Sequence, residues 1–213
     1  VGDELPFLAQ ALELWASSNP AHATESTVRT GAHGVQSLTP PELGDITLLH
    51  CDEGIPTLQE VLKIVAGQAP LLIELKDQDG SMGTAVGTLE RVTLAALKDY
   101  SGNVALMSFN PHTVAELARL APNIPRGLTT CSYTAVDWPT IPADRLDTLR
   151  GIPDYARTRA SFISHNVDDL QAPKVAALRS QGVPILCWTV TTRAQEMQAR
   201  RLADNVTFEG YAA

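Results

Sequence analysis

Two oppositely charged residues, Glu74 and Lys76, stand in a short and otherwise apolar run of residues that begins at Leu71. This composition is typical of a strand that is buried on both of its faces. Because side chains alternate along a strand, Glu74 and Lys76 point to one face together with Leu72, and the intervening apolar residues point to the other. Burying a charge costs several kcal/mol unless it has a partner or a ligand. The pair is therefore either a structural ion pair or, in the interpretation that we favour, a site for an anion and a metal.

The composition indicates a single domain of enzyme size. The chain has 213 residues, of which 44% are hydrophobic and 19% charged, and its formal net charge is −8. This negative charge argues against nucleic acid as the main partner, because a phosphate backbone requires clustered Lys and Arg. No apolar run approaches the ~18 residues of a membrane span. We therefore expect a small-molecule ligand, with neither nucleic acid nor an integral membrane segment.

The three cysteines, Cys51, Cys131 and Cys187, are widely spaced and form no CxxC pair. Their odd number and spacing predict buried free thiols in a reducing compartment, and disfavour a disulfide framework or a zinc site. The chain begins at Val1 without a signal-like segment, so we expect a cytoplasmic location.

From position 57 onward, strand-like and helical patterns alternate. The six predicted strands cover 71–76, 104–109, 126–131, 160–165, 185–190 and 205–208. The predicted helices cover 57–66, 89–97, 110–120, 173–180 and 193–202, and 146–149 belongs to another. This spacing is that of a β/α unit and predicts a parallel sheet. We predict that this sheet closes into an α/β fold of the TIM type, a (β/α) barrel with incomplete N-terminal units. An open doubly wound sheet is the alternative, although no GxGxxG turn follows a strand.

Polar residues gather where the predicted strands end, which is the edge where parallel β/α folds place their chemistry. They are Glu74, Lys76, Ser108, Asn110, Thr130, Cys131, Ser164, His165, Trp188, Thr189 and Glu209. We expect them to line one pocket, with Trp188 as an aromatic wall and Ser108 and His165 as ligand-binding groups. For His165, a role as an ordinary loop histidine is an equal alternative.

Four segments in this order resemble the glycerophosphodiester phosphodiesterase family. They are Ile55-Pro56-Thr57-Leu58-x-Glu60-Val61-Leu62, Leu71-Leu72-Ile73-Glu74-Leu75-Lys76, Met107-Ser108-Phe109 and Gly182-Val183-x-x-Leu186-Cys187-Trp188-Thr189-Val190. The similarity extends over residues 42–213 and leaves 1–41 as a degenerate or truncated front of a single domain, 1–213.

The resemblance implies an eight-stranded barrel, a divalent cation (Mg²⁺ or Ca²⁺) and hydrolysis of glycerophosphodiesters to glycerol 3-phosphate and an alcohol. Glu74 stands at the position of a metal-binding glutamate in the family. Lys76 stands at the position of a lysine that faces the phosphate and assists catalysis. Trp188 matches an aromatic residue near the glycerol end of the substrate. Ser108 and His165 complete the predicted substrate-binding set.

The front of the chain departs from the family pattern. It has no His-Arg-Gly triplet, and Glu13-Leu14-Trp15 keeps only the first carboxylate of a Glu-x-Asp pair. The resemblance makes Glu13 a candidate metal ligand. His22, which precedes Gly31 at the spacing of the second family histidine, is the candidate catalytic acid or base.

Two hypotheses follow from these departures. The first is a metal-dependent phosphodiesterase whose N-terminal motif lies outside this chain. The second is a non-catalytic barrel that binds a phosphorylated ligand or a protein partner through the same mouth, because loss of general acid–base catalysis typically costs ~10²–10⁴-fold in rate.

Overall fold

The computed structural model describes residues 12–14, 39–46 and 54–211. Within these residues a single sheet contains seven strands, all parallel, which follow one another in chain order. The strands are β1 (Leu12–Leu14), β2 (Leu71–Glu74), β3 (Val104–Ser108), β4 (Arg126–Thr130), β5 (Phe162–Asn166), β6 (Ile185–Val190) and β7 (Asn205–Phe208). The predicted parallel α/β sheet is therefore confirmed.

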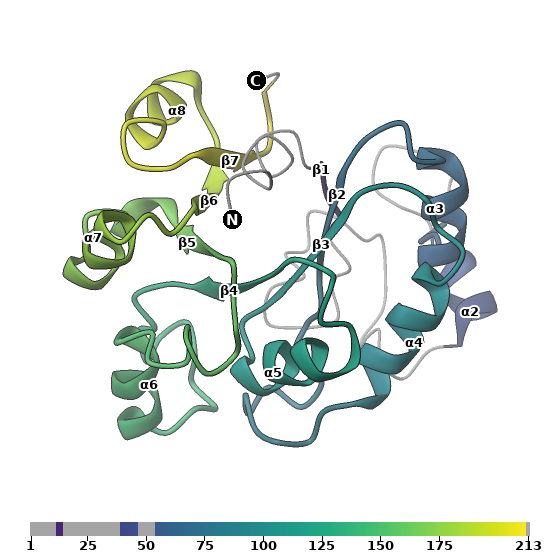
Figure 1. Cartoon of the computed structure of the whole chain (residues 1–213), viewed down its shortest axis with the longest axis horizontal. Coiled ribbons are helices and arrows are strands. Elements are labelled where there is room, and N and C mark those ends of the chain that lie inside the picture. The colour runs from purple at the N-terminus through teal and green to yellow at the C-terminus, as the bar shows by residue number, and fades with distance from the viewer. Residues whose placement is uncertain (1–11, 15–38, 47–53, 212–213) are drawn as a thin grey trace.

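Helices connect successive strands and lie around the outer side of the curved sheet (Figure 1). The α-helices of the described part are α2 (Pro40–Gly44), α3 (Leu58–Val65), α4 (Thr88–Leu97), α5 (Pro111–Leu120), α6 (Ala143–Arg150), α7 (Pro173–Ser180) and α8 (Arg193–Ala199). A short 3-10 helix, η2 (Val167–Asp169), follows β5. None of the described helices is long and apolar enough to cross a membrane.

Local sequence signals fix where the helices begin. Thr57 caps α3 through a reciprocal box in which its hydroxyl accepts from the Glu60 amide and the Glu60 carboxylate accepts from the Thr57 amide, at 2.7 Å. Asn110 caps α5, and Pro111 occupies its first turn, where a missing amide proton costs nothing. Helix α5 therefore starts directly after the end of β3, and its cap fixes the chain at that strand end.

The two faces of the sheet bury different sets of side chains. The inner face contributes a small apolar cluster of Leu72, Ala105, Met107, Phe162 and Leu186. The outer face packs against the helices, for example through Leu71, Ile73 and Leu75 against α3, α4 and α5. Leu72 thus points to the inner face while Leu71 and Ile73 point to the outer face, as the alternation in the sequence predicts.

Some predicted boundaries need correction. The fifth strand covers Phe162–Asn166, later than the predicted 160–165, and α8 ends at Ala199, before the predicted 202. Strand β1 and helix α2 were not among the predicted elements. Both are short, with three and five residues, so neither is long enough to produce a periodic pattern.

Candidate functional site at the carboxyl ends of the strands

Glu74 and Lys76 form a buried ion pair at the end of β2. Lys76 Nζ lies 2.8 Å from Glu74 Oε2, and their side chains are 9% and 2% exposed. Glu74 is in register with Met107 of the inner cluster, so its side chain points to the inner face. The predicted arrangement, with both charges on the face of Leu72, is therefore present in the structure.

Aromatic rings extend the site from Lys76 toward β6. Lys76 Nζ lies 5.9 Å from the centroid of the Phe109 ring, a distance that permits a cation–π interaction. Phe109 meets Trp188 edge to face, with centroids 5.4 Å apart, and its centroid is 5.0 Å from that of Trp138. The structure therefore brings Trp188 to the same side of the sheet as Glu74 and Lys76, as predicted.

A hydrogen-bonded loop holds the end of β2 against the start of α5. Asn110 is fully buried, and its side-chain amide donates to Asp77 Oδ1 at 2.7 Å and to the Gly83 carbonyl at 2.9 Å. The other Asp77 oxygen accepts from the Met82 amide at 2.8 Å. These bonds hold Asp77, the residue that follows Lys76, against the start of α5.

Three oxygen atoms on the inner face are buried without a hydrogen-bond partner in the described part of the chain. They are Glu74 Oε1, Thr129 Oγ1 and Ser164 Oγ. Gly127 is in register with Met107 and with Phe162, and Thr129 is in register with Ser164 two residues further on, so these residues share one face. Buried polar atoms normally have partners, and an exception indicates a water, ion or ligand. Sequence reasoning named Ser164 only as a strand-end residue and did not name Thr129.

Ser108 lies on the outer face of β3, away from Glu74. It is fully buried, and its hydroxyl donates to the Leu75 carbonyl at 2.6 Å and accepts from the Asn110 amide at 3.1 Å. The prediction that Ser108 lines the pocket with Glu74 therefore needs correction. Ser108 follows the inward-pointing Met107, so alternation turns its side chain outward.

His165 also points outward, because it follows the inward-pointing Ser164. Its Nδ1 lies 2.7 Å from Thr130 Oγ1 and its Nε2 lies 3.3 Å from Asp169 Oδ2. Burial lowers the pKa of His165, although Asp169 acts in the opposite direction. The ring borders a cavity of about 480 Å³ that includes Arg150 and Lys174, outside the Glu74 face. The expected position of His165 in the mouth is therefore corrected as well.

The remaining candidates lie partly or wholly outside the described residues. The backbone of β1 pairs Glu13 with Leu72, two residues before Glu74, while the Glu13 side chain is outside the description. His22 is outside it altogether. Among the described residues no three His, Cys, Asp or Glu side chains gather as a metal site. Glu74 alone fits one position of such a site, because it offers a buried carboxylate oxygen without a partner, a ligand that hard cations prefer.

The cysteines agree with the predicted free thiols as far as they are described. Cys131 and Cys187 are free and buried, and Cys51 lies outside the described residues. Burial raises the pKa of Cys131 to about 11 and that of Cys187 to about 12. Both thiols are therefore protonated near neutral pH and unsuited to act as nucleophiles.

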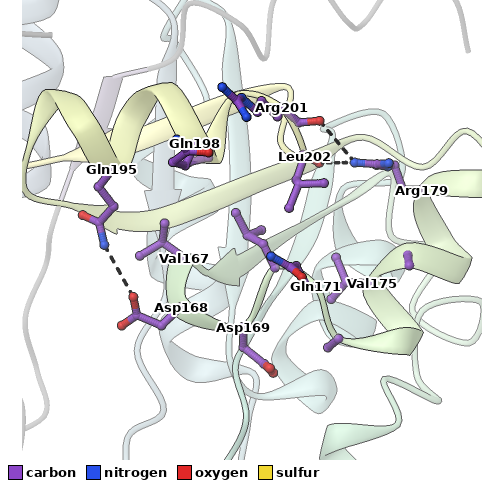
Figure 2. Close-up of a pocket in the computed structure, with 14 residues that line it drawn as sticks. Val167, Asp168, Asp169, Gln171, Val175, Arg179, Gln195, Gln198, Arg201 and Leu202 are labelled. Atoms are coloured by element: carbon purple, nitrogen blue, oxygen red, sulfur yellow. Dashed lines mark hydrogen bonds between the residues drawn. The ribbon is translucent and has the colours of Figure 1, made fainter.

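A larger cavity, of about 820 Å³, lies apart from the predicted site, between η2, α7 and α8 (Figure 2). Its polar rim includes Asp168, which accepts from Gln195 Nε2 at 3.5 Å, and Arg179, which donates to the Arg201 carbonyl at 3.4 Å. None of the described residues that were predicted to bind substrate or metal lines it. The charged pair at the strand ends therefore remains the candidate site.

The fold and the site together define a parallel β/α protein with a buried carboxylate and ammonium at the carboxyl ends of its strands, the edge that carries chemistry in such folds. A family model settles which group of these proteins is concerned. The chain belongs to the glycerophosphoryl diester phosphodiesterase family, whose model matches residues 9–207. This family places the protein among the phosphoric diester hydrolases, as the sequence resemblance implies.

Solved structures agree with this fold. A phosphodiesterase from Oleispira antarctica, in complex with the product sn-glycerol-3-phosphate, superposes with a TM-score of 0.67 at 17% identity, over 91% of this chain and 74% of that one. Glycerophosphodiester phosphodiesterases from Parabacteroides distasonis (TM-score 0.61, 21% identity, 82% and 68%) and Agrobacterium tumefaciens (0.60, 18%, 96% and 85%) are also similar. At these identities the likeness concerns the fold alone. No curated protein sequence gives a significant match.

Proposed function

We propose that the protein hydrolyses glycerophosphodiesters to glycerol 3-phosphate and an alcohol, with the help of a divalent cation, Mg²⁺ or Ca²⁺. The observation that carries this proposal is the Glu74–Lys76 pair, which is buried at the strand ends of a chain that belongs to the phosphodiesterase family. The presence of sn-glycerol-3-phosphate as a product in the Oleispira antarctica structure supports the substrate class.

Glu74 and Lys76 have complementary tasks in this proposal. Glu74 would hold the cation through its unpartnered oxygen, since hard cations take several oxygen ligands. A bound divalent cation would polarise the phosphoryl oxygens. The Lys76 ammonium would meet the negative charge that develops on those oxygens, in a site that excludes water. Its contact with Glu74 keeps the ammonium at the mouth before the substrate arrives.

The aromatic and N-terminal residues complete the proposed site. Trp188 and Phe109 form the apolar wall against which the carbon atoms of the substrate would pack. We propose Glu13 as a further ligand of the cation and His22 as the acid or base, in a closed eight-stranded barrel. The pairing of Glu13 with Leu72, next to Glu74 on the same face of β2, supports the first of these roles.

The direct test is the release of glycerol 3-phosphate. Purified protein would be incubated with glycerophosphoethanolamine and glycerophosphocholine in the presence of Mg²⁺, Ca²⁺ or EDTA, and the products followed by ³¹P NMR. We expect turnover with one of the two cations and none with EDTA. A protein that binds glycerol 3-phosphate and never cleaves a diester, with either cation, would instead support the non-catalytic barrel.

A further inference from the structure

Thr129 and Ser164 are neighbours on adjacent strands, and each has a buried hydroxyl group without a partner in the described part of the chain. The register of β4 and β5 pairs them directly, and they are 2% and 0% exposed. Their hydroxyl oxygens have no hydrogen-bond partner among the described residues. The two hydroxyls thus form a polar pair two residues after Gly127 and Phe162, which pair with each other on the same face of the sheet.

Two other buried hydroxyls in the described part of the molecule, those of Thr158 and Thr130, have partners. Thr158 is fully buried, and its hydroxyl donates to the carbonyl of Asp154 at 2.8 Å. Thr130, the neighbour of Thr129 in the chain, contacts His165 Nδ1 at 2.7 Å. These two hydroxyls therefore have partners, whereas the inward-facing pair of Thr129 and Ser164 has none among the described residues. This asymmetry is expected if the missing partner is a ligand.

The surroundings of the pair connect it with the candidate site. The indole of Trp188 donates to the Ser164 carbonyl at 3.1 Å, so the aromatic wall is fixed to the residue that carries one of the two hydroxyls. The unpartnered Glu74 Oε1 lies on the same face of the sheet. The charged end of the site is thus provided by Glu74 and Lys76, and the uncharged polar end by Thr129 and Ser164.

We propose that Thr129 and Ser164 form a subsite that binds the hydroxyl groups of the glycerol moiety of the substrate. This inference rests on the proposed function and adds the part of the site that recognises the polyol. A hydroxyl both donates and accepts, so two neighbouring hydroxyls match the two adjacent hydroxyls of a glycerol unit without any charge. A phosphate oxygen is a poorer match, because it is charged and because Lys76 already provides an ammonium for it.

The test compares two ligands and two variants. Glycerol 3-phosphate and propyl phosphate share a three-carbon chain and a phosphate and differ in the two hydroxyls. Isothermal titration would measure both with the wild type, Thr129→Val and Ser164→Ala, each at fixed Mg²⁺ or Ca²⁺. We expect each variant to bind glycerol 3-phosphate about three- to tenfold more weakly, the effect of one uncharged hydrogen bond. Binding of propyl phosphate should not change.

Thermal unfolding provides the second readout. Removal of a hydroxyl that has no partner among the described residues should leave the Tm of Thr129→Val and Ser164→Ala unchanged or raise it. Thr158→Val is the matched control, since its hydroxyl is equally buried and bonded to the backbone. This variant should lower the Tm and leave the affinity for both phosphates unchanged.

The outcomes separate this inference from the proposed function. If the wild type prefers glycerol 3-phosphate and both variants keep that preference, the hydroxyl pair only holds ordered water and the subsite is refuted. If the variants weaken the binding of propyl phosphate as much as that of glycerol 3-phosphate, the assignment to the glycerol hydroxyls is wrong. If the wild type cleaves no glycerophosphodiester, the proposed function fails, while the binding comparison still decides the subsite.

Discussion

Replacement of Lys76 by Met would separate a structural ion pair from a functional one. The variant keeps the length of the side chain and removes its charge, which leaves Glu74 alone in a position where its side chain is 2% exposed. A buried carboxylate without its partner costs about 3–5 kcal/mol of stability, because its charge is no longer compensated. We therefore expect Lys76→Met to lower the free energy of unfolding by an amount in this range.

The double variant Glu74→Leu/Lys76→Met gives the control for this loss. Replacement of both members of a buried ion pair by apolar residues of similar size is often neutral or stabilising. We expect the double variant to recover most of the stability that Lys76→Met loses. Phosphodiesterase activity should be lost in both variants, because neither carries the ammonium that we place at the phosphoryl oxygens.

Urea unfolding measures the stability of the wild type, the single variant and the double variant, and ³¹P NMR of the same samples measures their turnover. The reasoning holds if the double variant recovers its stability and still lacks activity. A double variant that is both stable and as active as the wild type would show that the pair only joins β2 to its surroundings, and would remove both residues from the site.

Three further changes test other parts of the structure. Gly127→Ala should destabilise the protein by about 1–3 kcal/mol in urea unfolding, because the added Cβ would lie 2.2 Å from the ring of Phe162, and an overfilled core must shift. His165→Gln should reduce the loss of stability that the wild type shows at acidic pH. Since burial lowers the pKa of His165 in the folded protein, the wild-type unfolded chain binds the additional proton as the pH falls below about 6.5, and unfolding curves at pH 7.5 and 5.5 would show the smaller difference in the variant. Thr57→Ala should cost about 1 kcal/mol in thermal unfolding, through loss of the capping box that it forms with Glu60.

The sequence predicts which side chains of a strand face inward wherever charge or composition distinguishes the two faces of that strand. In β2 the two charged residues identify the inner face, and the structure agrees for Leu72 and Glu74. In β5 both faces are apolar as far as Ile163. The sequence alone therefore does not tell which of the next two side chains, Ser164 or His165, faces inward. Only the register with β4 shows that Ser164 points inward.

The subsite formed by Thr129 and Ser164 was beyond sequence reasoning for a related reason. Threonine and serine are common in strands and at their ends, and nothing in their spacing shows whether a partner is present. That property depends on the packing of neighbouring strands. The ion pair of Glu74 and Lys76 was predictable, because charges in an apolar strand require an explanation whatever the tertiary structure.

The most direct test of the site is the effect of Glu74→Gln on metal-dependent hydrolysis. The change removes the charge of one buried carboxylate with almost no change in shape, and circular dichroism would verify that the fold is retained. At a saturating concentration of Mg²⁺ or Ca²⁺, kcat/KM for glycerophosphoethanolamine should fall by a factor of about 10² or more, the usual effect of losing a preorganised electrostatic group. A folded Glu74→Gln variant that binds the cation and cleaves the diester as the wild type does would contradict the assignment of this site.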